Sequence, residues 1–290
     1  MNGAFWLDPW RSSTTLWLVV SAAFAAIACG MPRAFLVLRR LSLTGDAISH
    51  SVLPGIVIGF LISGSLDSPW LIAGAAASGW LTVMIIGIFH RKAGVREDAA
   101  TGVVFTAMFS IGVILLRMFA SKVDLDPDCV LFGNLETAVH GSRTTIGSLE
   151  IPNIALTAVV AAVSSILFVT FIYHRLLCTS FDPVLSKLTG QAPDRTHSLL
   201  LALTAAVVVV AFQTVGAVMS VALLILPAAS ALLVARRLPG LLAGIVVHCL
   251  ISAVGGIYLA TWANCNLGAA VILMGAIVFL ISLVCFKLRI

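Results

Sequence analysis

Leu43-Thr-Gly-Asp-Ala-Ile-Ser-His50-Ser-Val-Leu-Pro-Gly55 is the stretch that decides how this chain folds. It continues into an apolar segment, and the fourteen residues from Ser51 to Gly64 span only about 21 Å as a helix. The hydrocarbon core of a bilayer is about 30 Å thick, so this segment is too short to cross alone. A helix that starts near Leu43 is long enough, and it carries Asp46 and His50 into the membrane region.

The composition of the whole chain agrees with a membrane location. Its 290 residues are 60% hydrophobic and 10% charged, with a mean hydropathy of +1.12, whereas soluble domains carry about 25% charged residues. Several apolar runs approach the roughly 20 residues that a spanning helix needs. The longest polar stretch, residues 119–150, is too short for an independent core. We therefore expect an all-α, polytopic membrane helix bundle that forms a single transmembrane domain over residues 1–290.

The apolar runs predict about nine transmembrane helices. They lie at about 14–36, 43–64, 69–89, 102–118, 153–173, 198–212, 215–235, 240–260 and 268–286. The sixth and seventh are separated only by Gln213-Thr214, and a single helix over 198–235 would be about 57 Å long. Because that is nearly twice the hydrocarbon thickness, we expect the chain to turn at Gln213-Thr214.

Basic residues set the expected orientation, with the N-terminus outside and the C-terminus in the cytoplasm. Thirteen of the 17 Lys and Arg then lie on the inner side, in line with the positive-inside bias. These are Arg33, Arg39, Arg40, Arg91, Lys92, Arg96, Arg175, Lys187, Arg195, Arg236, Arg237, Lys287 and Arg289; the outer side holds Arg11, Arg117, Lys122 and Arg143. Membrane topology thus accounts for the net charge of +5, and we expect lipid, not nucleic acid, around the chain.

Asp46 and His50 are the first candidates for a functional site. Ionisable groups inside a bilayer usually pair with another group or mark a substrate path. Four residues apart on a helix they share one face, and a carboxylate with an imidazole suits a divalent transition metal such as Mn, Fe or Zn. Pro54-Gly55 should kink or loosen the helix one turn later. Freed carbonyls are tolerated only against protein or water, which favours a face that lines a cavity.

The cytoplasmic segment at about 176–197 is a second feature. Asp182-Pro183 predicts a helix start, with the acid as the cap and the proline at the first helical position. Gly190 predicts the end of that helix. The result is a short amphipathic helix outside the membrane, between two spans. It is either an ordinary connector or, in a transporter driven by a separate motor, a docking helix.

Other residues are further candidates for the ion pathway. Glu97 and Asp98 are interpreted first as caps of the helix that follows, and second as part of a partner-docking surface. His248 lies mid-span, where a buried histidine bonded to a neighbouring helix is the commoner arrangement. The small-residue run from Gly74 to Gly79 predicts close helix packing.

Cysteines and catalytic motifs add little. Cys129 and Cys265 both fall on the expected outer side, and a disulfide between them stays open. The chain contains no G-x-x-x-x-G-K-[ST], no His-Glu-x-x-His and no Gly-x-Ser-x-Gly sequence. The chain therefore shows no energy-coupling or catalytic machinery of its own, and we do not expect it to be an enzyme.

Four blocks of sequence resemble the zinc/manganese/iron ABC transporter permeases, in the same order as in that family. The most specific is the opening stretch, preceded by Leu38-Arg39-Arg40. The others are residues 96–105, Leu131-Phe-Gly133-Asn134, and residues 215–229. The resemblance covers nearly the whole chain. Family members often carry an acid after Leu-Phe-Gly, so no ligand role is carried over to Asn134.

The resemblance implies the membrane subunit of a bacterial importer in the plasma (inner) membrane, with a vitamin-B12-importer-like (type II) permease fold. Two permease chains, identical or paralogous, would form the pore. ATP-binding subunits would lie beneath them, and an external metal-binding protein would deliver the ion. No cofactor would be bound permanently. Asp46 and His50 would contact the transported ion, and the ATPase-coupling residues would be Phe181, Asp182, Pro183, Leu188 and Gly190.

Two alternatives stay open within this interpretation. The Ile-Ser-His and Leu-Pro-Gly spellings lie nearer to manganese/iron members of the family than to zinc members, although ligand type alone does not fix the metal. A self-contained secondary transporter is the alternative function, with Asp46 and His50 as a proton relay. It predicts uptake that follows the proton gradient and needs no ATP-binding subunit.

Overall fold

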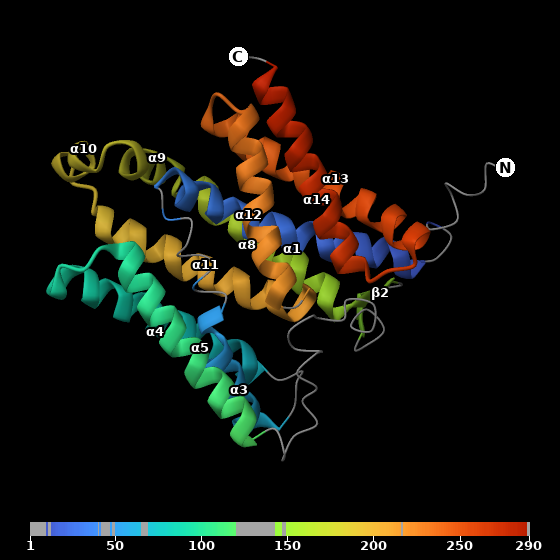
Figure 1. Cartoon of the computed structure of the whole chain (residues 1–290), viewed down its shortest axis with the longest axis horizontal. Coiled ribbons are helices and arrows are strands. Elements are labelled where there is room, and N and C mark those ends of the chain that lie inside the picture. Colours follow the sequence, from blue (N-terminus) through green and yellow to red (C-terminus); the bar gives the residue numbers. More distant parts are fainter. Residues whose placement is uncertain are drawn as a thin grey trace. The chain divides into compact units, whose positions relative to one another are not determined.

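The structure is a computed structural model of the full chain, and it describes residues 10, 13–39, 41, 47, 50–64, 69–119, 143–146, 149–215 and 217–288. These residues are mostly helical (Figure 1). Seven of the helices are long and apolar enough to cross a membrane. They are α1 (Ser13–Leu38), α4 (Pro69–Ala93), α5 (Glu97–Phe119), α8 (Asn153–Phe171), α11 (Pro193–Val215), α13 (Leu238–Ala263) and α14 (Leu267–Lys287).

These helices confirm seven of the nine expected spans. The other two match shorter apolar helices in the described residues, α3 (Leu53–Ser63) and α12 (Ala217–Val234). Residues 42–46 and 48–49 lie outside the described residues, so a helix start near Leu43 stays a prediction. The turn expected at Gln213-Thr214 is wrong in position, because α11 continues to Val215 and α12 begins at Ala217. Hydropathy required a break in this long run but could not place it.

A small hairpin was not predicted from the sequence. Strands β1 (Arg143–Ile146) and β2 (Leu149–Pro152) pair antiparallel, from Arg143 opposite Pro152 to Ile146 opposite Leu149. A cross-strand ion pair joins Arg143 Nη1 to Glu150 Oε2 at 3.2 Å. The sequence did carry a signal, since Gly147-Ser148 separates two β-rich segments by two residues, as in tight hairpins.

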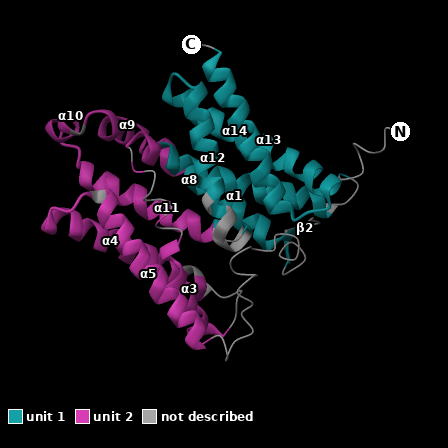
Figure 2. Ribbon diagram, in the orientation of Figure 1, with its two compact units in different colours: residues 1–34, 131–166, 211–290 teal, residues 35–130, 167–210 magenta. Residues whose placement is uncertain are grey.

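Two compact units divide the helices, and each is built from separate stretches of the chain (Figure 2). Unit 1 contains residues 1–34, 131–166 and 211–290, and in it α12, α13 and α14 pack on one another. Unit 2 contains residues 35–130 and 167–210. In unit 2, α3, α4 and α5 pack pairwise, and α9 (Tyr173–Phe181) packs against α10 (Pro183–Leu188). The single domain over residues 1–290 stays a prediction.

Glycines bring α3 and α4 together in unit 2. A Cβ atom on Gly74 of α4 would clash with the carbonyl oxygen of Gly55 on α3, and a Cβ atom on Gly55 would clash with the carbonyl oxygen of Gly74. Gly59 has the same relation to the carbonyl oxygen of Trp70. Small residues allow helix backbones to approach closely in membranes. The packing predicted for the run that begins at Gly74 is therefore confirmed.

Candidate functional site

His50 lies just before α3 and is half-buried against α5. Its ring centroid is 5.5 Å from that of Phe105 and 5.8 Å from that of Phe109, and the two phenyl rings are 6.2 Å apart. Phe105 and Phe109 are four residues apart, so they stack on one face of α5. The histidine therefore has an aromatic wall on one side. Asp46 lies outside the described residues, so its pairing with His50 stays a prediction.

The two phenylalanines were missed by reasoning from the sequence. Phe105 ends one of the blocks that resemble the metal permeases, and Phe109 follows one helical turn later. That spacing was the available signal, but aromatic residues at helical spacing are ordinary in a membrane span. Only the packing of α5 beside α3 distinguishes them. This packing is close, because a Cβ atom on Gly112 would lie 3.0 Å from both Leu53 and Pro54.

The backbone after His50 is interrupted where the proline was expected to loosen it. Val52 adopts a turn, α3 begins at Leu53, and Pro54 sits in the first helical turn, where a missing N–H is tolerated. The Ser51 carbonyl, beside this interruption, accepts a hydrogen bond of 2.7 Å from the Ser78 hydroxyl on α4 and therefore faces protein.

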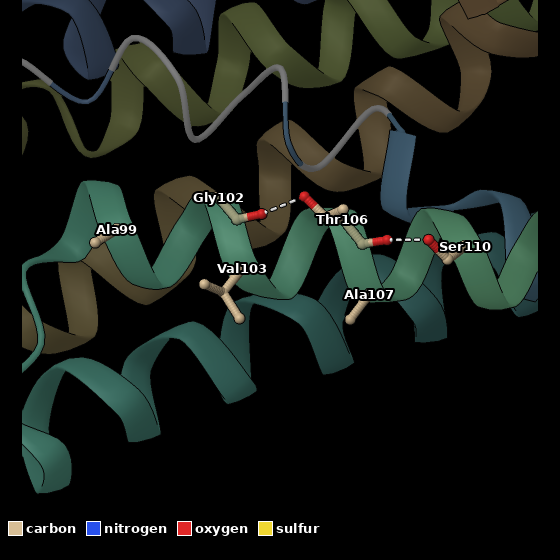
Figure 3. A pocket seen from close by; sticks show the side chains of 6 residues that line it. All are labelled: Ala99, Gly102, Val103, Thr106, Ala107 and Ser110. Carbon is tan, nitrogen blue, oxygen red and sulfur yellow. Dashed lines mark hydrogen bonds between the residues drawn. The ribbon is translucent and has the colours of Figure 1, made fainter.

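One face of α5 bears only small side chains beside a hollow of about 630 Å³ (Figure 3). The residues that line it are Ala99, Gly102, Val103, Thr106, Ala107 and Ser110. The Thr106 hydroxyl donates to the Gly102 carbonyl at 2.7 Å, and the Ser110 hydroxyl donates to the Thr106 carbonyl at 2.8 Å. Both hydroxyls are thus satisfied within their own helix, and the face suits helix packing better than polar binding.

Of the further pathway candidates, Glu97 and Asp98 belong to the same unit as His50, whereas His248 belongs to the other unit. Asp98 is exposed in the first turn of α5, where its carboxylate lies 3.9 Å from Arg96 Nη2, and the side chain of Glu97 lies outside the described residues. Asp98 lies seven positions before Phe105, or about 10 Å along the helix axis. His248 belongs to unit 1, where it is 3% exposed within α13.

A complete metal-binding set is not present in the residues that the structure describes. No three His, Cys, Asp or Glu side chains among them lie close enough to hold an ion. His50 is the only member of the predicted pair that is described. Cys265 is an exposed free thiol among the described residues, and its expected disulfide partner Cys129 lies outside them, so that bond stays open.

The short helix predicted within residues 176–197 is confirmed as α10. The Asp182 carboxylate accepts hydrogen bonds from the Val184 and Leu185 amides, at 3.1 and 2.9 Å, and Pro183 occupies the first turn. Gly190 has φ +76° and ends the helix. Its amide bonds to the Lys187 carbonyl and the Gln191 amide bonds to the Ser186 carbonyl, which is the pattern of a Schellman C-cap.

The helix presents apolar side chains outward. Leu188 is 80% exposed, Val184 is 69% exposed and Phe181, at the end of α9, is 66% exposed, whereas Ser186 is the buried residue of α10. An exposed apolar cluster at a polar chain segment is typical of an interaction surface. The segment is therefore a capped helix with an exposed apolar face. A simple connector between two spans needs no such face, so the geometry favours a docking helix.

Comparisons with known proteins agree with these observations over almost the full length. The model of a family described as the ABC 3 transport family matches residues 12–286. The manganese transport system membrane protein MntD of Bacillus subtilis (strain 168) is 35% identical over 263 residues, which cover 91% of this chain and 89% of that protein. The zinc transport system membrane protein TroD of Treponema pallidum (strain Nichols) is 34% identical, covering 91% of this chain and 72% of that protein.

A solved structure has the same fold. It is described as PsaBC from Streptococcus pneumoniae in complex with Fab. The two chains superpose with a TM-score of 0.79 at 30% sequence identity, covering 96% of this chain and 94% of the other. At this coverage the similarity extends into both units.

Proposed function

The chain belongs to the ABC 3 transport family, and from that premise we propose that it is the membrane permease subunit of an ATP-driven importer of divalent transition-metal ions. The family match over residues 12–286 is the observation that carries the proposal. The names of the relatives support a metal ion as the cargo, since MntD is named for manganese and TroD for zinc. We favour manganese or iron over zinc, because the Ile-Ser-His50 and Leu-Pro54-Gly sequences are nearer to manganese/iron members of the family than to zinc members.

The ion path in this proposal runs past Asp46 and His50. A carboxylate and a neutral imidazole hold a borderline divalent ion without binding it too tightly to release. The aromatic wall of Phe105 and Phe109 restricts the rotamers of the His50 side chain. The side chain therefore loses little conformational entropy when the ion binds. Two side chains are too few for a full coordination shell. The remaining ligands come from residues outside the described part of the chain, from water, or from a second permease chain.

Energy for transport enters through the segment at about 176–197. The chain has no nucleotide-binding motif of its own, so a separate ATP-binding subunit supplies hydrolysis. The exposed apolar residues Phe181, Val184 and Leu188 form the surface that this subunit covers. The caps at both ends of α10 keep the helix from fraying when the ATP-binding subunit moves against that surface. An external metal-binding protein delivers the ion on the opposite side of the membrane, and the permease alternates between outward-open and inward-open states.

Uptake of metal by cells tests the proposal. The double substitution Asp46→Ala and His50→Ala should abolish accumulation of manganese, iron and zinc, each supplied separately, while the protein still assembles with its ATP-binding subunit. His90→Ala is the matched control, because His90 is exposed at the end of α4. Normal accumulation in the double variant would overturn the site. Uptake that follows the proton gradient and needs no ATP-binding subunit would overturn the function in favour of a secondary transporter.

A further inference from the structure

Arg39, at the end of α1, uses all three nitrogens of its guanidinium group within unit 2. Nε donates to the Ser180 hydroxyl at 3.0 Å, and Nη2 donates to the Thr179 hydroxyl at 2.6 Å. Nη1 lies 3.5 Å from His197 Nδ1. One side chain thus joins α1 to the last residues of α9 and the first turns of α11.

The hydrogen bonds of Arg39 are more buried than those of an ordinary surface contact. Thr179 is 5% exposed, and Arg39 is itself half-buried. Phe35 and Leu36, one turn before Arg39, are fully buried, and the Arg39 amide continues the helix by bonding to the Phe35 carbonyl at 3.0 Å. A rigid helix end therefore carries the guanidinium. Lysine has a single nitrogen and could not reach the same three partners at once.

The two ends of this contact lie next to the two functional segments. On one side, Thr179 and Ser180 directly precede Phe181 and Asp182, which start the exposed surface and the cap of α10. On the other side, only ten residues of sequence separate Arg39 from His50. A displacement of α9 and α10 therefore acts on Arg39 through Thr179 and Ser180, and the chain leads from Arg39 into the segment that carries His50.

We propose that Arg39 is a positioning residue that transmits movement of the α9–α10 segment to the segment that carries Asp46 and His50. The inference rests on the proposed function and deepens it, because it names the link between the ATP-binding subunit and the ion path. The link works through hydrogen bonds from a charged group, which are stronger than neutral ones.

The experiment measures coupling, with the assembled transporter in proteoliposomes that hold the ATP-binding subunits and are supplied with manganese-loaded binding protein. The readout is the number of manganese ions accumulated per ATP hydrolysed. Arg39→Gln should lower this ratio about tenfold, the size expected for loss of hydrogen bonds to a charged group, with ATP hydrolysis changed less than about twofold. The ratio for Arg39→Lys should lie between the ratio for Arg39→Gln and that for the unchanged protein. Arg91→Gln, at an exposed arginine of α4, should change nothing.

A second substitution separates coupling from simple destabilisation. Thr179→Val keeps the shape but removes the acceptor, and it should lower the same ratio. The combined Arg39→Gln, Thr179→Val variant should then be no worse than Arg39→Gln alone, because both changes remove one contact. Three results would overturn the inference while leaving the proposed function standing. The effects of the two substitutions could multiply in the combined variant, the ratio of manganese to ATP could stay unchanged in Arg39→Gln, or uptake and ATP hydrolysis could fall equally. If the unchanged protein takes up no metal with ATP, the proposed function is wrong and the inference falls with it.

Discussion

Gly74 shows how a single hydrogen atom in place of a side chain sets the distance between two helices. Its Cα faces the carbonyl oxygen of Gly55, with no room for a methyl group. Gly74→Ala should destabilise the protein by about 1–3 kcal/mol, the usual effect of forcing a methyl group into a well-packed contact. Thermal unfolding of the purified protein in detergent measures this.

The matched control is Gly87→Ala, in the same helix. A Cβ atom on Gly87 meets nothing within 4 Å, and alanine is a better helix former than glycine by about 0.5–1 kcal/mol. Its melting temperature should therefore stay the same or rise. Equal destabilisation by both substitutions would show that the loss comes from the helix backbone and not from the contact between α3 and α4.

His50 could be predicted from the sequence as a functional candidate, but the residues around it could not. The cost of an imidazole in a bilayer identified it as a functional candidate without any structure. Its neighbours Phe105 and Phe109 could not be found that way, because apolar residues of one span are interchangeable until a partner helix is placed beside them. The remaining ion ligands are hidden for a related reason. In the proposal they come from elsewhere in the chain, from water or from a second chain, and sequence spacing within one helix gives no information on those sources.

At the scale of the element, α10 depends on its N-cap. Asp182→Ala removes the acceptor for the Val184 and Leu185 amides, and loss of such a cap costs about 0.5–2 kcal/mol. Because α10 has only six residues, this loss should fray the helix and weaken binding of the ATP-binding subunit. The fraction of that subunit that co-purifies with the permease measures the effect.

Asparagine tests whether the cap or the charge matters in α10. Asp182→Asn keeps an oxygen that accepts both amides, and asparagine is as good an N-cap as aspartate. Co-purification should therefore be retained in Asp182→Asn and reduced in Asp182→Ala. If both variants lose the ATP-binding subunit equally, the carboxylate contacts that subunit directly and the capping explanation is wrong.

Local elements were predicted well where a few neighbouring residues decide them. The start of α10 at Asp182-Pro183 and its end at Gly190 are set by hydrogen bonds within nine residues. The boundary between α11 and α12 was misplaced at Gln213-Thr214, because the length of an apolar run requires a break without choosing its position. The hairpin of β1 and β2 was missed, since its short polar strands lie between spans where hydropathy carries no signal.

For the whole molecule, the orientation in the membrane rests on the distribution of charge. The helices do not show the direction of crossing, because helix packing is the same whichever end faces the cytoplasm. Only the excess of Lys and Arg on one set of loops distinguishes the two orientations. A direct test must therefore report on which side a loop lies, independently of helix structure.

Two exposed cysteines provide that test. Cys265 lies in the connection between α13 and α14, and Cys285 lies in the last turn of α14. In variants that keep only one cysteine, a membrane-impermeant maleimide added to intact cells should modify Cys265 but not Cys285, because the reagent reaches only thiols on the outer side of the membrane. Cys285 should react after the membrane is permeabilised. Because each variant lacks Cys129, a disulfide to that residue cannot hide Cys265. Labelling of Cys285 but not of Cys265 in intact cells would reverse the orientation, and would place the α10 surface on the side of the membrane where no ATP-binding subunit can reach it.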